Sequence, residues 1–304
     1  MKNRRWWSVL KVLLTVACLF WVLNLLQGGF PEPEKIWNAL CQIPWYWHVA
    51  AGLSATVNWW IETLKWQLLV SNIEKLRFAN AIKGLLAGAA ANHVLPFRVG
   101  EFLGRVMYLK EENRPAALLN NYFGAACQTL ITLVAGIPAA YALLGKRAEQ
   151  YGQNSILYIS TIFLVLGIGW FMLKTRAGKP AWIEKWLKGF RNFSAKQIAG
   201  AFGLSLLRYG VFGGFYIFFI VQFQLAEFNN AVTGVACIFF IQTFTPGMIY
   251  TDAAVRLSLP LLVFPLPDEQ KPLLMGIALI NYFYNVLLPA ILGVIIFTLH
   301  KWKR

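Results

Sequence analysis

Long apolar stretches alternate with short polar segments along the whole chain. A helix needs about 20 predominantly apolar residues to cross a bilayer, and six stretches are close to that length. We predict one transmembrane helix in each of these stretches: 8–26, 46–69, 118–144, 156–173, 197–223 and 274–299. Trp45, Tyr46 and Trp47 mark the start of the second span, because aromatic residues are enriched where a span meets the membrane interface.

A shorter apolar stretch at 84–95 follows the second predicted span. About twelve residues are too few to cross the membrane, and runs of this length are typical of re-entrant or interfacial segments. Basic residues stand on both sides, Lys83 before the stretch and Lys110 after it, which places both ends at the cytoplasmic face. We therefore predict an inner hairpin over 79–110 that enters from the cytoplasm and returns to it.

The apolar stretch at 231–264 has the opposite surroundings. Glu227 precedes it and Asp268 follows it, and neither flank carries a basic excess, so we place both flanks outside. A stretch with both ends outside must enter and leave from the same side. We predict an outer hairpin over 231–266, oriented opposite to the first.

The composition and the charge distribution support a membrane protein. Apolar residues make up 58% of the chain and charged residues only 13%, against roughly 25% charged in an average soluble domain. The net charge of +15 would suit a nucleic-acid partner, but the basic residues gather at the two ends and between 174 and 196. This placement is typical of cytoplasmic loops. We predict no nucleic-acid partner, cytoplasmic termini and a bacterial-type inner (plasma) membrane location.

The predicted fold class is an all-α polytopic membrane protein with about six full spans and two oppositely oriented re-entrant hairpins in an inverted repeat. We expect one integral membrane domain over 1–304 with four parts: 1–45, first span and external linker; 46–145, first repeat; 155–196, connecting span and basic cytoplasmic segment; 197–299, second repeat. Apolar and basic residues recur at helical spacing over 180–191, which predicts an amphipathic helix on an anionic membrane surface. A protein-partner site is the alternative there.

Charged residues interrupt the inner hairpin. Arg98, Glu101 and Arg105 lie in a region otherwise suited to lipid, with Pro96 and Gly100 between or beside them. Each ionised group at bilayer depth costs roughly 2.5–3.5 kcal/mol on insertion scales if it is left unpaired. Proline and glycine break a helix, and uncoiled backbone at that depth must be buried in protein or line a water-filled cavity. The stretch therefore indicates a functional or structural charge site.

The outer hairpin contains a related stretch. Both stretches have an amide four residues before a proline and an acid four residues before an arginine: Asn92, Pro96, Glu101 and Arg105 in the first, and Gln242, Pro246, Asp252 and Arg256 in the second. Gly247 follows the second proline. Residues at i,i+4 share a helix face, so each acid can pair with its arginine. Two broken hairpins from opposite sides predict a cavity at mid-membrane.

Two interpretations of these charges stay open. Arginine presents planar donors that match phosphate, so Arg98, Glu101, Arg105, Asp252 and Arg256 are candidate contacts for a lipid headgroup. The alternative is a structural charge network that fastens the two hairpins. The candidate hairpin breaks and cavity-lining positions are Asn92, His93, Pro96, Gly100, Gln242, Pro246 and Gly247. For Asn92, His93 and Gln242 we expect hydrogen bonds between helices.

Other polar residues receive simpler interpretations. Glu62 and Lys65 lie in the final third of their span and are predicted to snorkel to the cytoplasmic surface. Arg208 either snorkels or approaches the cavity. The scattered cysteines and histidines show no metal or redox spacing, and no nucleophile, base and orienting group recur together. We expect no metal, cofactor or catalytic residue, and an enzymatic activity stays uncertain.

The residues Pro96, Arg98, Gly100, Glu101 and Arg105 resemble the signature of the flippase-like family named after the transmembrane region of lysylphosphatidylglycerol synthase. The second family motif usually reads P-G-G-x-G-x-x-E, and this chain departs from it after Pro246 and Gly247. Some members carry a fused soluble aminoacyl-transferase that is missing here, so we do not expect lipid aminoacylation by this chain alone.

The resemblance implies movement of a lipid or lipid-linked sugar between leaflets, or support of an enzyme that acts on such a lipid. The leading hypothesis is a flippase-like protein whose ligand is a phospholipid or a polyprenyl-linked lipid. A membrane-embedded enzyme that modifies headgroups is one alternative, with Glu101 or Asp252 as proton acceptor. A non-catalytic scaffold for a lipid or glycan enzyme is another. The sequence leaves the oligomeric state open.

Overall fold

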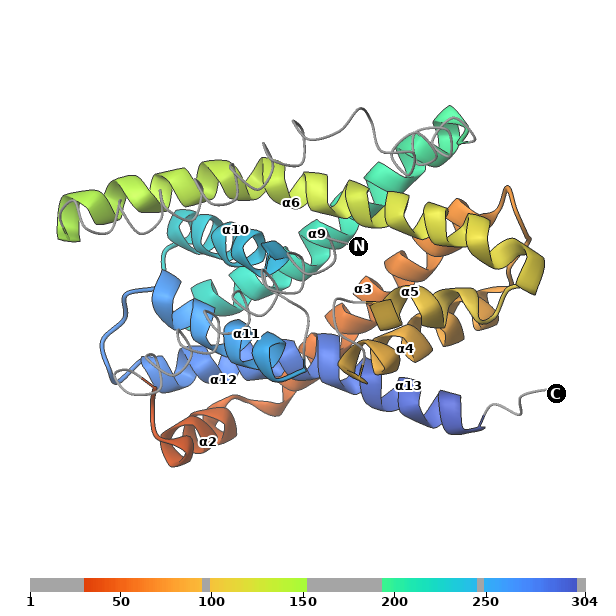
Figure 1. The fold of residues 1–304 in the computed structure, drawn as a ribbon. Helices are drawn as coiled ribbons and strands as arrows, with labels where there is room; N and C mark the ends of the chain where they lie inside the picture. Colours follow the sequence, from red (N-terminus) through yellow and green to blue (C-terminus); the bar gives the residue numbers. More distant parts are fainter. Residues whose placement is uncertain (1–29, 95–98, 152–192, 245–248, 300–304) are drawn as a thin grey trace, which may run out of the picture.

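The computed structural model describes residues 30–94, 99–151, 193–244 and 249–299, and these residues fold into packed helices (Figure 1). The elements in chain order are α2 (Pro33–Gln42), α3 (Trp45–Val70), α4 (Phe78–Val94), α5 (Val99–Val106), the 3-10 turn η2 (Glu111–Asn113), α6 (Arg114–Tyr151), α9 (Ala195–Gln222), α10 (Phe228–Phe244), α11 (Ile249–Val263), α12 (Lys271–Tyr282), the π-helical turn η3 (Phe283–Leu287) and α13 (Leu288–Leu299). The described part of the chain contains no β-strand, so the all-α class is confirmed.

Three helical segments are long and apolar enough to cross a membrane: Glu111–Leu143, Ala195–Gln222 and Lys271–Leu299. They coincide with three of the six predicted spans, and the chain is a multi-pass membrane protein. A fourth predicted span corresponds to α3, whose 26 residues make a helix about 39 Å long. The predicted spans over 8–26 and 156–173, and the amphipathic segment over 180–191, lie outside the described residues. The total of six spans therefore stays a prediction.

The helices recur with a fixed offset along the chain. The first three begin at Trp45 (α3), Phe78 (α4) and Val99 (α5), and the corresponding three begin 150 residues later, at Ala195 (α9), Phe228 (α10) and Ile249 (α11). The fourth position in the order is held by α6 in the first half and by α12, η3 and α13 together in the second. The first three helices of the two halves thus recur in the same order, and the fourth position differs.

The equivalent helices α3 and α9 cross in antiparallel orientation. Three contacts mark this crossing from one end of α3 to the other: Trp47 with Phe218, Asn58 with Arg208, and Leu68 with Gln197. A shift of 150 residues converts the first pair into the third, and Asn58 pairs with its own equivalent. The crossing therefore has an approximate two-fold relation between the halves.

The helices around the crossing of α3 and α9 also pair between the two halves. Helix α10 lies along α6, and α4 lies along α13 (Figure 1). At each of these two contacts a glycine lies where a larger residue would collide with the neighbouring helix. A Cβ added to Gly136 would collide with the side chain of Phe240, and one added to Gly293 would collide with the backbone of Leu86. These glycines let α10 approach α6 closely, and let α4 approach α13 closely.

The pair α4 and α5 is held together by direct backbone contact. A Cβ added to Gly100 would collide with the backbone of Ala91, and one added to Gly104 would collide with Gly88. Small residues allow this approach between membrane helices, where apolar burial alone drives little association. The contact fixes the face of α5 that carries Glu101 and Arg105.

A candidate polar site at the centre of the helices

A buried carboxylate, that of Glu62 on α3, joins helices from both halves. Its Oε2 lies 2.7 Å from Lys65 Nζ and 3.0 Å from Arg208 Nη1, and its Oε1 lies 2.8 Å from Arg105 Nη1. Arg105 also pairs with Glu101 one turn earlier on α5. We call these five residues the Glu62 cluster.

The predicted snorkelling of Glu62 and Lys65 is wrong. Each residue retains only 2% of its accessible surface, because α3 lies between α4, α6 and α9. Burial of an isolated charge is prohibitive, but a carboxylate that contacts three cations avoids that cost. Arg208, for which the sequence left two choices, points inward to this carboxylate.

Arg105 has little capacity left for a ligand. Nη1 donates to Glu62 Oε1 at 2.8 Å and to Asn121 Oδ1 at 3.1 Å, while Nη2 pairs with Glu101. The side chain is only 6% exposed. The i,i+4 pair expected from the sequence is confirmed, and its arginine additionally ties α5 to α3 and α6.

The Glu62 cluster keeps an excess of positive charge. Lys65, Arg105 and Arg208 bring three cations, and Glu62 and Glu101 bring two carboxylates. Arg208 is the most accessible of the three cations, with 28% of its side chain exposed. It is the fourteenth residue of the 28-residue helix α9, so the charge lies near mid-span.

A series of amides leads away from the Glu62 cluster. Arg208 Nε donates to Asn58 Oδ1 at 3.1 Å, and Asn58 Nδ2 donates to Asn285 Oδ1 at 3.1 Å. Asn285 Nδ2 then donates to Asn281 Oδ1 at 2.9 Å. Asn285 belongs to η3, and π-helical turns inside α-helices are frequent at functional sites. The amides connect the Glu62 cluster to α12.

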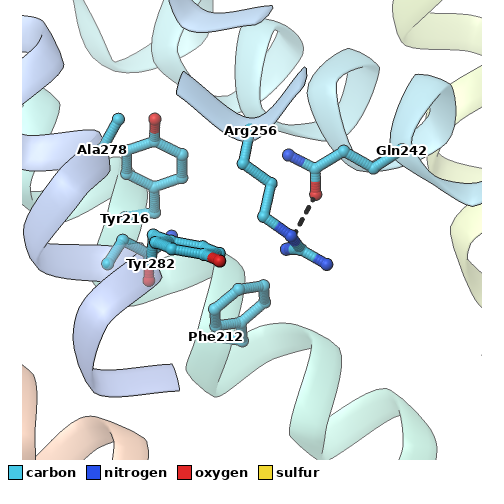
Figure 2. A pocket seen from close by; sticks show the side chains of 7 residues that line it. Phe212, Tyr216, Gln242, Arg256, Ala278 and Tyr282 are labelled. Carbon is cyan, nitrogen blue, oxygen red and sulfur yellow. Dashed lines mark hydrogen bonds between the residues drawn. The ribbon is translucent and has the colours of Figure 1, made fainter. Parts of the chain in front are cut away.

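The second motif forms a separate site at the other end of these amides. Arg256 Nε is 2.8 Å from Asp252 Oδ2, and Arg256 Nη1 donates to Gln242 Oε1 at 3.4 Å. Arg256 borders a small pocket between α9, α10, α11 and α12 (Figure 2). The pocket is lined by Phe212, Tyr216, Gln242, Arg256, Ala278, Asn281 and Tyr282. We call it the Arg256 pocket.

The two sites differ in the residues around the two motif arginines, which are 151 residues apart, one more than the offset between the helices. Position 212, which is 150 residues after Glu62, is a phenylalanine. No second carboxylate therefore reaches Arg256 from α9 as Glu62 reaches Arg105 from α3. The Arg256 side chain is 18% exposed, three times the value for Arg105. One arginine is enclosed, and its counterpart faces a pocket.

The structure brings together part of the expected site. Glu101 and Arg105 meet in the Glu62 cluster, whereas Asp252, Arg256 and Gln242 meet at the Arg256 pocket. Gly100 and Asn92 lie at the α4–α5 contact, where the side-chain oxygen Oδ1 of Asn92 is buried without a hydrogen-bond partner among the described residues. Arg98, Pro96, Pro246 and Gly247 lie outside the described residues. His93 belongs to α4, but its side chain is also outside the description.

The sequence analysis missed several site residues, chiefly Asn58, Asn281, Asn285, Tyr216 and Tyr282. Their signal was a polar side chain in the middle of an apolar helix, which in membrane proteins points to an interior face. Within the described ranges, no group of three or more histidine, cysteine or acidic residues could hold a metal ion.

A multi-pass helical bundle with ionised side chains paired at mid-span is an integral membrane protein organised around a polar centre. The chain belongs to the lysylphosphatidylglycerol synthase TM region family, whose family model matches residues 8–265. Searches of curated proteins and of solved structures gave no match. Family membership confirms the resemblance seen in residues 96–105 and connects the chain with a membrane lipid-related function.

Proposed function

We propose that this protein binds the headgroup of an anionic lipid or lipid-linked glycan at mid-membrane and moves it between the leaflets. The observation that carries the proposal is Arg256, an arginine that borders a pocket and has a single carboxylate partner among the described residues. A guanidinium group offers paired donors that match a phosphate. Membership of a lipid-related membrane family supports the same ligand class.

In the proposed architecture, α4–α5 and α10–α11 are re-entrant hairpins of an inverted repeat. The offset of 150 residues and the antiparallel crossing of α3 and α9 support it, because equivalent helices then cross the membrane in opposite directions. Glu74 accepts hydrogen bonds from Lys110 N and Asn113 Nδ2, at 3.1 and 2.8 Å. The start of α4 and the end of α5 are thus near each other, as in a hairpin with both ends on one side.

The two arginine sites take different roles in this proposal. Arg105 fastens α5 to α3 through Glu62, which accords with the structural interpretation of the first motif. Arg256 contacts the lipid phosphate, and Asp252 orients its guanidinium group through the Nε contact. Arg98 stays a candidate headgroup contact outside the described residues. The acyl chains remain in lipid while the headgroup crosses.

The amides between the two sites provide a polar route. Asn281 borders the Arg256 pocket, and Asn285 and Asn58 continue from it to Arg208. A headgroup that leaves Arg256 would meet these amides next and then the positive charge of Arg208. Each step replaces a hydrogen bond between side chains with one to the ligand, which keeps buried polar groups satisfied.

Reconstitution into vesicles tests the proposal. Purified protein is expected to accelerate exchange of fluorescent anionic lipids between leaflets. Arg256→Gln is expected to slow this exchange by roughly 10- to 100-fold, since hydrogen bonds to charged groups contribute about 1.5–3 kcal/mol. Arg114→Gln is the matched control, because Arg114 lies outside both sites: it pairs with the exposed Glu111 and donates to the Leu109 carbonyl oxygen. Absence of exchange across phospholipids and polyprenyl-linked glycolipids would reject the function.

A further inference from the structure

We propose that α2 is an interfacial helix that binds the lipid surface. Its Trp37, together with Trp45 and Tyr46 at the start of α3, lies at the boundary between the lipid headgroups and the acyl chains. The inference goes beyond the proposed function and does not depend on lipid transport. It follows from the place of α2 at the end of two spans, from the division of its surface and from the exposed aromatic rings.

Helix α2 lies at one end of the spanning helices. Ile43 and Pro44 alone separate it from α3, and proline cannot continue a helix because it lacks a backbone N–H. Leu40 and Ile43 also contact the first turns of α12, since a Cβ added to Gly276 would lie 3.5 and 3.8 Å from their side chains. Figure 1 shows α2 beside α12. The starts of α3 and α12 thus place α2 where the bilayer meets water.

One side of α2 faces the protein, and the flank next to it is apolar and uncovered. Ala39 and Ile43 retain 9% and 4% of their accessible surface, and Leu40 packs on the same core. Trp37 lies three residues before Leu40 and therefore borders this buried side, yet it is 67% exposed. Cys41, one turn after Trp37, is also exposed. The flank that carries Trp37 and Cys41 is the apolar edge of α2.

The opposite flank of α2 is polar. Lys35, Asn38 and Gln42 share it at helical spacing, and all three are exposed. Lys35 Nζ lies 3.3 Å from Glu32 Oε2, and both of these side chains are more than half exposed. A helix with an apolar edge and a charged or polar flank is suited to lie in the membrane interface, with the polar flank in water. The polar flank thereby determines which edge of α2 faces lipid.

Two aromatic residues at the start of α3 extend the same surface. Trp45 and Tyr46 are 75% and 53% exposed, and their ring centroids are 6.2 Å apart. The next residue, Trp47, packs inward on Phe219 with a centroid distance of 4.9 Å, which fixes the start of α3. Tryptophan and tyrosine combine an apolar ring with a polar tip, so they favour the boundary between hydrocarbon and water. The two outward rings therefore match the headgroup level of a bilayer.

The exposed face of α3 continues from these rings toward the middle of the helix. It carries apolar side chains at helical spacing: Val49, Leu53, Val57 and Trp60. Helix α3 has 26 residues and is long enough to cross the bilayer, so this face is suited to acyl chains. Aromatic rings at the end of such a face stand where the acyl chains give way to headgroups. We therefore assign lipid, and not a protein partner, as the occupant.

Spin labels on α2 test its position against the bilayer. The full chain, with its four native cysteines replaced, carries one nitroxide label at Trp37→Cys or at Gln42→Cys in nanodiscs of phosphatidylethanolamine and phosphatidylglycerol. Both positions are exposed, and they lie on opposite flanks of one helix. The label at 37 should collide more with oxygen, which dissolves preferentially in lipid, than with a water-soluble nickel chelate. The matched label at 42 should show the reverse.

A second label needs no substitution on α2. Native Cys41 shares the flank of Trp37, and with the other three cysteines replaced its label should show the same preference for oxygen. In this protein, Trp37→Ala should raise the collisions of the label with the nickel chelate, because the ring no longer holds the helix in the interface. Asn38→Ala, on the polar flank, is the matched control and should leave these collisions unchanged.

Two results would overturn the inference. Equal access of the nickel chelate to positions 37 and 42 would place both flanks of α2 in water. Little collision with either reagent at position 37 would show that protein, such as a second copy of this chain, covers the ring. Neither result bears on lipid exchange between leaflets, which is measured separately.

Discussion

Asn58 and Arg208 are equivalent residues of the two halves and are hydrogen-bonded to each other. Each is the fourteenth residue of its helix, and the Nε–Oδ1 distance is 3.1 Å. Arg208 also contacts Glu62, so the point where α3 and α9 cross is also the edge of the Glu62 cluster. The crossing of α3 and α9 and the polar centre are therefore one feature, and substitutions there should affect folding before they affect the proposed transport.

Glu62→Gln should strongly destabilise the protein. Removing this charge leaves Lys65, Arg105 and Arg208 without their shared carboxylate, and breaking a buried pair costs about 3–5 kcal/mol. Thermal unfolding in detergent measures the effect as a lower Tm. Glu111→Gln is the control, because the Glu111 side chain is 88% exposed. Equal Tm values for both variants would show that the Glu62 cluster does not hold the helices together.

Gly104→Val should prevent the close packing of α4 and α5. The added side chain would collide with the backbone of Gly88, which cannot move aside as a flexible side chain can. In contrast, a Cβ added to Gly203 on α9 meets no atom within 4 Å. Gly203→Ala should raise stability by up to about 1 kcal/mol through helix propensity. The yield of folded protein and the Tm compare the two, and a well-folded Gly104→Val would refute the backbone contact.

The two motif arginines should respond differently to the same substitution. Arg105→Gln should lower the Tm by more than Arg256→Gln. Arg105 contacts two carboxylates and Asn121, whereas Arg256 contacts one carboxylate and Gln242. Arg256→Gln should retain most of the stability and lose lipid binding. A larger Tm loss in Arg256→Gln would reverse the two roles assigned here.

Part of this division could be predicted from the sequence. The i,i+4 pairs Glu101–Arg105 and Asp252–Arg256 depend on local helix geometry alone, and both form as expected. The difference between the arginines depends on what another helix brings to each. Glu62 on α3 is distant in sequence from Arg105, and only packing brings them together. The charge of Glu62 was visible in the sequence, but its partners were not, so a surface position was wrongly assigned.

Three of the predicted spans could be identified from the sequence, because length and apolarity define a transmembrane helix. The sequence also predicted two related halves, over 46–145 and 197–299, and the first three helices of these halves start 150 residues apart in the structure. The amides Asn58, Asn281 and Asn285 could not be connected in advance. Their hydrogen bonds join α3 to η3 and α12, and neither periodicity nor spacing predicts such a crossing.

Single-cysteine labelling should test the topology. In a background without native cysteines, residues 72 and 112 should be accessible from the cytoplasm, and residues 228 and 269 from outside. The first pair flanks α4–α5 and the second pair flanks α10–α11, so each hairpin should start and end on one side. Opposite accessibility within either pair would require a full crossing in place of a re-entrant hairpin.

The most direct test of the central claim is to locate the lipid phosphate. A phosphatidylglycerol with a photoreactive headgroup, cross-linked to the reconstituted full chain and mapped by mass spectrometry, should label residues on α11 and α12 that surround Arg256. The label should decrease in Arg256→Gln and persist in Arg114→Gln. Labelling confined to α5 around Arg105, or labelling unchanged by Arg256→Gln, would contradict the assignment of the headgroup to the Arg256 pocket.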